Sequence, residues 1–492
     1  MSAEVLVIAL DSCERQLVLD WADDGTLPTF RRLLATSKRR DVMNAPGFFG
    51  GTVWPSFATG LSPAGHGRYC ALQSPRGAYE SRRFGSTDID GRQFWEIASD
   101  AGRRVAVIDV PMSRPSPRLN GIQTIDLLTH DGFFNPPVTT PPELYAEITA
   151  AFGPGRRDTC DERSTSLDAA DQVAAFTDHL VRRARTKGRL CGHYLRREGW
   201  DLFVATFAEG HCAGHQGWHV HDSTHPRHRR AVADVAGDPL RTVYRAIDEQ
   251  IAELLDAAGP RAQVMLWLTH GMGSAINDFS VVTDEILCRL DSATGRGASG
   301  PFRNMKRVWY RLPSALRNLR SAGALRNALV PGLRSSLLIP TRRRRRYFAI
   351  PSDTSTGAVR INRIGREEAG LVAPGTEFRS VLDELARDLA EIVDAETGVP
   401  AVLATHLPGD LYDGPHLDEL PDLLVEWNHD HRFTELRSPR IGTLPIPQLI
   451  GRSGEHRNQG LLVTRVDDGA ATEPPIPVEG LAALILEHLG LG

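Results

Sequence analysis

The chain lacks the long apolar runs and the one-sided charge that mark membrane proteins and nucleic-acid-binding proteins. The apolar run at its N-terminus, Val5 to Leu10, has six residues, whereas a membrane helix needs about 20. A basic start and a small-residue cleavage site are also missing there, so no signal peptide is indicated. The net charge is -4 over 492 residues, which attracts neither nucleic acid nor an anionic membrane. We therefore expect a cytoplasmic protein.

Cysteine is scarce, with six residues and no Cys-x-x-Cys pair. This scattered spacing predicts neither a disulfide framework nor a zinc knuckle, and we expect mostly buried thiols. The hydrophobic content of 41% and the charged content of 24% are ordinary for a soluble globular protein. The length allows one large domain with insertions, or two or three smaller domains.

Strand and helix patterns alternate along the first half of the chain. Such alternation predicts an α/β fold whose central, mostly parallel sheet carries helices on both faces. The strands are expected at Val5–Leu10, Val105–Ile108, Leu202–Phe207 and Val264–Leu268, and two of the helices at Ala170–Ala184 and Leu240–Ala258.

A basic segment at residues 292–346 interrupts this pattern. We interpret it as an insertion or cap between a first part of the catalytic core, residues 1–291, and the completion of the core at residues 347–492. A charge run is usually a solvated face, and the alternative is a basic rim that attracts an anionic substrate. Strand patterns resume at Ala358–Ile361, Leu423–Trp427 and Leu461–Val463, which finish the sheet or form a small subdomain.

Polar residues follow the predicted strands. Asp11, Asp109, Glu209 with His211, and His270 each come just after one of them. Ligands in parallel sheets bind beyond the carboxyl ends of the strands, so we expect these side chains at one edge of the sheet. Asp11 is either a carboxylate ligand of a metal or a cap of the following helix.

The segment from Gly50 to Gly67 carries a candidate nucleophile. The Gly-Gly pair lets the backbone approach a ligand closely, and Thr52 stands just before a predicted helix, where backbone N–H groups favour anions. A threonine hydroxyl there suits attack on phosphorus beside a metal. The alternative is that Thr52 or Ser56 is a helix N-cap, and His66 is expected to fix a turn rather than bind a metal.

Histidines cluster after the strand at Leu202–Phe207. His211 and His215 are four residues apart, so on a helix they share a face and can bind one ion. His270 follows a predicted strand, and His456 is expected in a Gly-bounded loop before one. Each is a candidate ligand or a buried, hydrogen-bonded histidine. The remaining members of the cluster are expected in a polar loop or behind the metal ligands; they are His219, His221, His225 and His228.

These segments, in this order from Asp11 to His456, resemble the alkaline phosphatase superfamily, and within it the type I phosphodiesterase/nucleotide pyrophosphatase family. The segment His211-Cys-Ala-Gly-His215 is similar to the family's Asp-x-x-Gly-His, and His270-Gly-Met272 to its Asp-His-Gly-Met. The resemblance implies an alkaline-phosphatase-like sheet and two zinc ions. It assigns His211, His215 and His456 to one ion, and Asp11, Thr52 and His270 to the other.

Three positions depart from the family pattern. His211 stands where the family has an aspartate, so we expect Glu209 to supply a carboxylate. Thr269 replaces the aspartate before His-Gly-Met, and the usual nucleophile position falls at Gly50. The second metal site is therefore expected to bind a weaker ion or none, and either Thr52 or a metal-activated water is the nucleophile.

A segment from Gly357 to Glu367 also resembles one in bacterial members of the family. Arg360 and Arg366 there are candidates for clamping a substrate phosphate or carboxylate, because a guanidinium offers a bidentate fork. The alternative is that they form surface salt bridges.

The sequence thus predicts a metal-dependent hydrolase of small-molecule phosphodiesters or phosphomonoesters. One alternative is another group transfer on the same scaffold, such as phosphonate or sulfate ester hydrolysis or phosphoryl transfer. Sulfatases of this superfamily need a modified Cys or Ser in the nucleophile segment, and no cysteine occurs there. A second alternative is a catalytically degenerate homologue that keeps one metal.

Overall fold

The computed structural model describes residues 3–48, 50–129, 134, 136–154, 167–293, 341–353, 355–446, 452–465 and 470–492. The chain divides into two compact units. The first comprises Met1–Ser62, Gly85–Ser274 and Gly451–Gly492, and the second comprises Pro63–Phe84 and Ala275–Ile450. Nearly all of the basic segment at 292–346 lies outside the described residues, so the insertion and its boundaries stay predictions.

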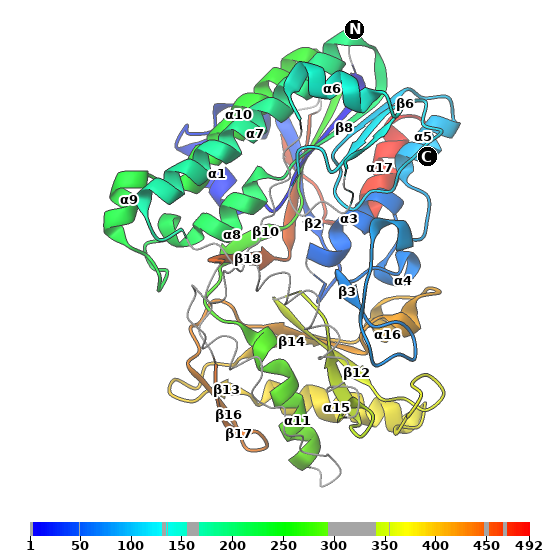
Figure 1. Ribbon diagram of the computed structural model, residues 1–492, viewed down its shortest axis with the longest axis vertical. Coiled ribbons are helices and arrows are strands. Elements are labelled where there is room, and N and C mark those ends of the chain that lie inside the picture. The colour runs from blue at the N-terminus through cyan, green and yellow to red at the C-terminus, as the bar shows by residue number, and fades with distance from the viewer. Residues whose placement is uncertain are drawn as a thin grey trace. The chain divides into compact units, whose positions relative to one another are not determined.

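Ten described strands form the central sheet of the first unit (Figure 1). Strand β1 lies between β8 and β9 and runs parallel to both, with Leu6 paired to Phe203 on one side and to Val264 on the other. β5 and β6 extend the parallel part, whereas β7 and β19 pair antiparallel with their neighbours β6 and β9. The order is β20 (Ala471–Thr472), β2 (Ser37–Met43), β19 (Gln459–Arg465), β9 (Gln263–Leu268), β1 (Ala3–Leu10), β8 (Trp200–Phe207), β5 (Val105–Ile108), β6 (Gly121–Ile125) and β7 (Val138–Thr140), with β21 (Ile476–Pro477) beside β2.

Both faces of this sheet are buried. Leu6 and Ile8 of β1 belong to one apolar core, and their neighbours Val5 and Val7 belong to another. Successive side chains of a strand point to opposite faces, so a strand covered on both sides reads as one continuous apolar run. The first core is completed by α1 (Arg15–Asp23), α2 (Pro28–Thr36), α7 (Ala170–Arg197) and α10 (Pro239–Ala258), and the second by α3 (Gly50–Thr59), α5 (Phe94–Asp100) and α17 (Gly480–His488).

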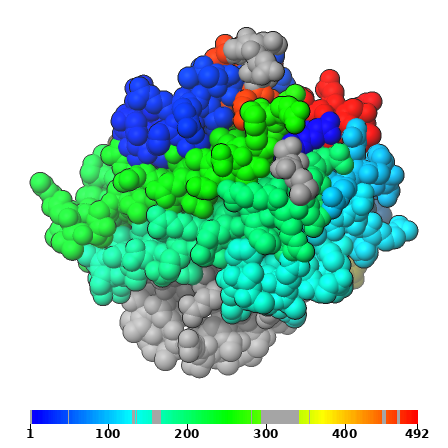
Figure 2. All heavy atoms as spheres, turned by 90° about the horizontal axis from the view of Figure 1, so that it is seen from above, coloured from blue at the N-terminus to red at the C-terminus, as the bar shows by residue number. Residues whose placement is uncertain are grey.

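Helices α7 and α10 form the outer layer on one face of the sheet. They run side by side across the surface shown in Figure 2. Both predicted helices and all four predicted strands are confirmed, and α7 continues beyond the expected end at Ala184 to Arg197. The predicted α/β class is therefore correct for this unit. Smaller helices of the unit are α6 (Leu144–Phe152) and α9 (Arg230–Ala236).

The second unit is built on an antiparallel sheet with the order β11 (Tyr347–Ile350), β12 (Thr356–Ile361), β15 (Leu423–Trp427) and β14 (Val402–His406). Its core includes Val359 and Val425 from this sheet, and it is covered by α11 (Thr283–Ala293) and α15 (Thr376–Ala390). Two of the three late predicted strands fall here, whereas Leu461–Val463 falls in β19 of the central sheet. A smaller sheet contains β13 (Val393–Asp394), β16 (Glu435–Ser438) and β17 (Gly442–Pro445).

Within the described part of the chain, no helix combines the length and the apolar character that a bilayer span requires.

Candidate metal centre

Helix α8 (Glu209–His221) carries the histidine cluster to the carboxyl edge of the central sheet. It begins two residues after β8 ends at Phe207. Strand β10 (Gly271–Ser274) follows β9 at the same edge, and β18 (Gly454–Arg457) pairs antiparallel with it, with Met272 opposite His456. This pairing brings His456 to α8, although it lies 241 residues after His215.

Two glycines allow α8 and β18 to approach one another. A Cβ atom on Gly454 would lie 2.2 Å from the carbonyl oxygen of Gly214, and a Cβ atom on Gly214 would lie 2.7 Å from Cγ of Met272. A side chain at Gly454 would push β18 away from α8, and one at Gly214 would displace Met272 of β10. Close packing thus explains why glycines stand at 214, directly before His215, and at 454, two residues before His456.

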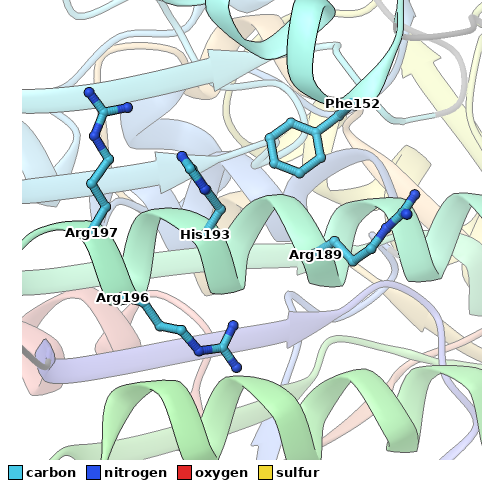
Figure 3. A pocket seen from close by; sticks show the side chains of 5 residues that line it. All are labelled: Phe152, Arg189, His193, Arg196 and Arg197. Carbon is cyan, nitrogen blue, oxygen red and sulfur yellow. The ribbon is translucent and has the colours of Figure 1, made fainter.

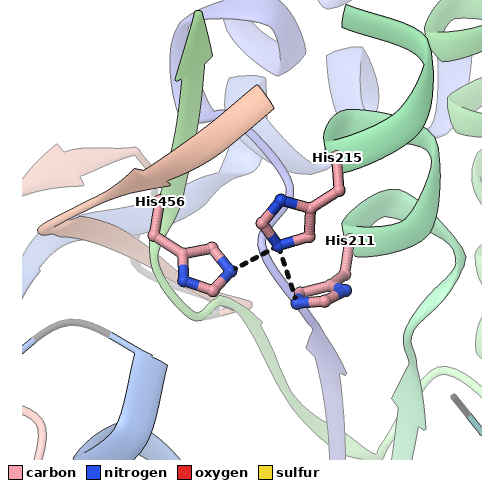
Figure 4. Close-up of side chains that lie close together, drawn as sticks. All are labelled: His211, His215 and His456. Carbon is pink, nitrogen blue, oxygen red and sulfur yellow. Dashed lines mark hydrogen bonds between the residues drawn. The ribbon is translucent and has the colours of Figure 1, made fainter. Parts of the chain in front are cut away.

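Three imidazoles converge between α8 and β18 (Figure 4). Nε2 of His215 lies 3.2 Å from Nε2 of His211 and 3.0 Å from Nε2 of His456. Ligand nitrogens about 2.0–2.1 Å from a tetrahedral zinc ion lie roughly 3.3 Å from each other, so these separations fit one shared ion. Among the described residues, this is the one group of three or more His, Cys, Asp or Glu residues whose ligand atoms all lie within 4.8 Å of one another.

The surroundings orient the ring of His215 and keep the ring of His456 neutral. Nδ1 of His215 lies 2.7 Å from the carbonyl oxygen of Gly454, so it carries the proton and leaves the Nε2 lone pair facing the other two rings. Burial and the neighbouring His270, His215 and His211 hold the pKa of His456 well below its usual value. Neutral imidazoles are the form that binds a metal.

The predicted second set of ligands has other partners. Trp54 donates its indole N–H to Oδ1 of Asp11 at 3.2 Å. Nε2 of His270 lies 2.6 Å from the hydroxyl oxygen of Ser12, and its Nδ1 lies 3.0 Å from that of Thr269. The ring of His270 contacts the ring of His456 edge-on, with centroids 4.5 Å apart, so this network adjoins the three-histidine cluster.

Glu209 is fully buried but lies outside the three-histidine group. Its Oε1 accepts a hydrogen bond of 2.7 Å from Nε of Arg183 on α7, and Arg183 also contacts Cys212. The carboxylate therefore joins α7 to the first turn of α8. A metal-binding role for Glu209 stays a prediction.

Thr52 is buried in the first turn of α3, which begins two residues earlier than expected, at Gly50. Its hydroxyl oxygen is inaccessible to solvent and has no hydrogen-bond partner among the described residues. The N-cap alternative is therefore wrong for Thr52, and Ser56 lies inside the helix rather than at its start. Trp54 connects this helix to Asp11, and the role of Thr52 as nucleophile stays a prediction.

The other histidines of the cluster are bonded to protein groups. His219 lies between the hydroxyl of Ser453 and the carbonyl oxygen of Leu167, at 2.9 and 3.1 Å, and burial lowers its pKa to about 4. Nδ1 of His221 lies 2.7 Å from Asp238. The last two also have backbone contacts: His225 accepts from the backbone N–H of Arg227, and His228 lies 2.9 Å from the carbonyl oxygen of His219.

Arg360 and Arg366 lie in the second unit, where both are buried. Arg366 donates to both carboxylate oxygens of Asp422, at 2.7 and 2.5 Å, and to Glu367 at 2.7 Å. Arg360 donates to the carbonyl oxygen of Glu419 at 2.6 Å. Arg360 also lies 3.6 Å from Glu367. Both arginines therefore form salt bridges, but these are buried rather than on the surface, and substrate binding by either arginine stays a prediction.

A basic hollow of about 460 Å³ opens on the outer side of α7 (Figure 3). Three arginines, a histidine and an aromatic ring line it: Arg189, Arg196, Arg197, His193 and Phe152. Arg197 is paired with Glu147, and Arg196 lies 3.4 Å from Glu253. These ion pairs neutralise much of the positive charge, so the hollow is not a second centre of comparable chemistry.

Sequence reasoning missed four polar residues at the centre. Ser12 and Arg183 are described above, and Arg452 and Glu455 form a buried pair 3.4 Å apart beside the cluster. Glu455 also accepts the backbone N–H of His456 at 3.1 Å. The one sequence feature that could have indicated two of them is their position beside predicted ligands, since Ser12 follows Asp11 and Glu455 precedes His456.

The family model of type I phosphodiesterase / nucleotide pyrophosphatase matches residues 5–456. Comparison with curated proteins gave no match. Phosphonoacetate hydrolase from Sinorhizobium meliloti 1021, in complex with phosphonoacetate, is similar in structure, with a TM-score of 0.55 and 13% identity over 99% of this chain and 96% of that one. Murine ectonucleotide pyrophosphatase / phosphodiesterase 5 gives a TM-score of 0.46 and 13% identity over 99% and 95% of the two chains.

The family match covers most of the chain, including Asp11 and the three histidines of the centre. The likeness to phosphonoacetate hydrolase supports the fold. The chain therefore belongs to the type I phosphodiesterase/nucleotide pyrophosphatase family, and it is a phosphoester hydrolase of the alkaline phosphatase superfamily.

Proposed function

We propose that the chain hydrolyses phosphodiester or phosphomonoester bonds of small molecules with a divalent metal ion, zinc by preference, held by His211, His215 and His456. The observation that carries the proposal is the convergence of their three Nε2 atoms, at 3.2 and 3.0 Å from the central one. Imidazole suits zinc, and three-histidine sites leave one coordination position open. A bound zinc ion supplies a Lewis acid that polarises a phosphoryl oxygen.

Several residues of the chain favour binding of a metal ion and of an anionic ester. His456 is held neutral, and His215 is fixed by its hydrogen bond to the Gly454 carbonyl. Thr52 offers a buried hydroxyl in the first turn of α3, where the N-terminal N–H groups of the helix favour negative charge. These features support Thr52 as the nucleophile.

In the proposed reaction the Thr52 oxygen forms a bond to phosphorus, and the bond between phosphorus and the ester oxygen breaks. The leaving oxygen keeps that electron pair and takes up a proton, while the hydroxyl loses its own. Water then breaks the bond between Thr52 and phosphorus and restores the hydroxyl. Hydrolysis of a diester would release an alcohol and a monoester.

The test combines zinc analysis of the purified chain with turnover of bis-p-nitrophenyl phosphate and p-nitrophenyl phosphate. We expect His456→Ala to lose both zinc and turnover. Thr52→Ala should keep zinc and lose turnover by 10²-fold or more, as expected for a missing nucleophile. His193→Ala, a change of an exposed histidine on α7, is the matched control and should keep both.

Other outcomes separate the alternatives. Zinc-free protein with full turnover would contradict the proposal, and full turnover by Thr52→Ala would favour a water nucleophile. Zinc binding without hydrolysis across a broad ester panel would favour a degenerate homologue. A separate assay should use phosphonoacetate, the ligand of the similar Sinorhizobium meliloti hydrolase, to test for cleavage of a phosphorus–carbon bond.

A further inference from the structure

The imidazole of His270 is enclosed by hydroxyl groups. The Ser12 oxygen lies 2.6 Å from Nε2 and the Thr269 oxygen 3.0 Å from Nδ1. A neutral imidazole has one N–H and one lone pair, so these two contacts occupy both. To coordinate a metal through Nε2, His270 would have to give up its contact with Ser12.

Ser12 is itself held in this position. It is fully buried, its backbone N–H donates to Oγ1 of Thr269 at 3.1 Å, and its φ of 51° is unusual for a residue other than glycine. The backbone at Ser12 and the side chain of Thr269 therefore fix the hydroxyl against the imidazole from two sides. The contact between Ser12 and His270 therefore belongs to a hydrogen-bonded network that also includes Thr269.

The carboxylates nearest to this network are engaged by other groups: Glu14 accepts the backbone N–H of Met272 at 2.8 Å, and Glu209 accepts from Arg183. Thr269 is neutral where family members have an aspartate, and Asp11 already accepts the Trp54 indole N–H at 3.2 Å. A divalent cation needs anionic or well-aligned oxygen and nitrogen ligands to offset its dehydration. Among the described residues, no second group of three His, Cys, Asp or Glu residues accompanies the three-histidine cluster. These residues do not fit a second ion.

We infer that the chain binds one metal ion, at His211, His215 and His456, and that the hydrogen-bonded chain Ser12–His270–Thr269 takes the place of the second. This inference rests on the proposed metal centre. His270 then acts as a positioning residue: its ring packs edge-on against His456, with centroids 4.5 Å apart, and the two hydroxyls fix its orientation. The family resemblance alone implies two ions, so we expect this chain to differ from the family pattern in the number of metal ions that it binds.

The experiment counts zinc ions per full-length chain. The protein is stripped with dipicolinate, reloaded with zinc and passed over a chelating resin, and zinc is then measured by plasma mass spectrometry and by native mass spectrometry. We expect one tightly bound zinc for the wild type, for Ser12→Ala and for His270→Ala, and none for His456→Ala. Titration with Co²⁺ should give tetrahedral absorption bands that saturate at one equivalent.

A variant designed to restore the second zinc site tests whether Ser12 and Thr269 prevent its formation. Ser12→Ala combined with Thr269→Asp removes the hydroxyl from Nε2 of His270 and adds the carboxylate, so we expect it to bind a second zinc ion. If the double variant keeps its fold by circular dichroism but still binds only one zinc ion per chain, then Ser12 and Thr269 are not what prevents binding of a second ion.

Two further outcomes would overturn the inference and are distinguishable. Two zinc ions in the wild type, with one lost in His270→Ala, would contradict the single site and leave the proposed hydrolase function standing. No tightly bound zinc in the wild type would contradict both.

Discussion

Arg183 and Glu209 form an ion pair inside the first unit, with Nε and Oε1 2.7 Å apart and side-chain exposures of 3% and 0%. The pair joins α7 to the first turn of α8, two residues before His211. Glu209 stands where sequence reasoning expected a metal ligand, yet its carboxylate is bonded to a guanidinium. We regard this pair as part of the support for the helix that carries two of the three histidines.

Arg183→Met should therefore be strongly destabilising, because it leaves the Glu209 carboxylate buried without its cation. Breaking a buried ion pair from one side typically costs about 3–5 kcal/mol. The measurement is the free energy of unfolding in urea. Arg185→Met is the matched control on the same helix, since Arg185 and its partner Glu249 have exposures of 56% and 51%. A surface pair contributes about 1 kcal/mol or less, and equal losses in the two variants would contradict the prediction.

Zinc should stabilise the folded chain through the three-histidine cluster. A ligand that binds only the native state adds about 2.7 kcal/mol when its free concentration is 100 times Kd. We expect the wild-type melting temperature to rise with free zinc and to fall on addition of a chelator. In His456→Ala both shifts should vanish. A zinc-dependent shift of the same size in that variant would mean that the stabilising ion binds elsewhere.

Local patterns in the sequence were enough to predict four parallel strands of the central sheet, β1, β5, β8 and β9, but not the parallel strand β6 or the antiparallel strands β2 and β7. The apolar run at Val5–Leu10 lies in the central strand β1, whose two faces are both covered. A strand that is buried on both faces has a continuous apolar sequence, so its position could be predicted from composition. The spacing of His211 and His215 likewise predicted that they share one face of a helix, which α8 confirms. Both signals are local in sequence.

The contacts around the centre could not be predicted in this way, because they join distant segments. His456 was connected to His215 only through the family resemblance, and the contact between Ser12 and His270 spans 258 residues. Nothing in the sequence near Glu209 indicates that Arg183, on another helix, is its partner. Contacts of this kind form when distant segments pack against one another. Secondary-structure propensity and hydrophobic periodicity describe only local sequence, so they do not predict such contacts.

Gly454 should be intolerant of a side chain. A Cβ atom there would lie 2.2 Å from the Gly214 carbonyl oxygen, so Gly454→Ala must move β18 away from α8 and separate His456 from His215. The change also disturbs the Gly454 carbonyl that orients His215. Loss of such outer-shell partners typically lowers metal affinity 10–100-fold, which competition with a chromophoric chelator would measure. Gly199→Ala is the control, because a Cβ atom at Gly199 meets nothing within 4 Å, and it should leave the affinity unchanged.

The second unit should show a pH dependence that originates at His66. This side chain is fully buried in α4 (Pro63–His66), and burial, Arg68 and His416 lower its pKa to about 3. Its Nδ1 accepts the backbone N–H of Arg68 at 3.1 Å. In the unfolded chain a histidine titrates near 6.5, so below that pH the unfolded state binds a proton that the folded state excludes.

The contribution of His66 is therefore fully present above about pH 6.5 and is lost progressively as the pH falls toward 3, by up to about 1.4 kcal/mol for each pH unit. His66→Asn keeps an acceptor for the Arg68 N–H but cannot titrate. We expect it to be less stable than the wild type at pH 7 and to lose less stability between pH 6.5 and 4. Urea unfolding across this range measures the two slopes, with His193→Asn as the control for loss of an exposed histidine. Equal slopes in the wild type and His66→Asn would mean that His66 is protonated in the folded chain.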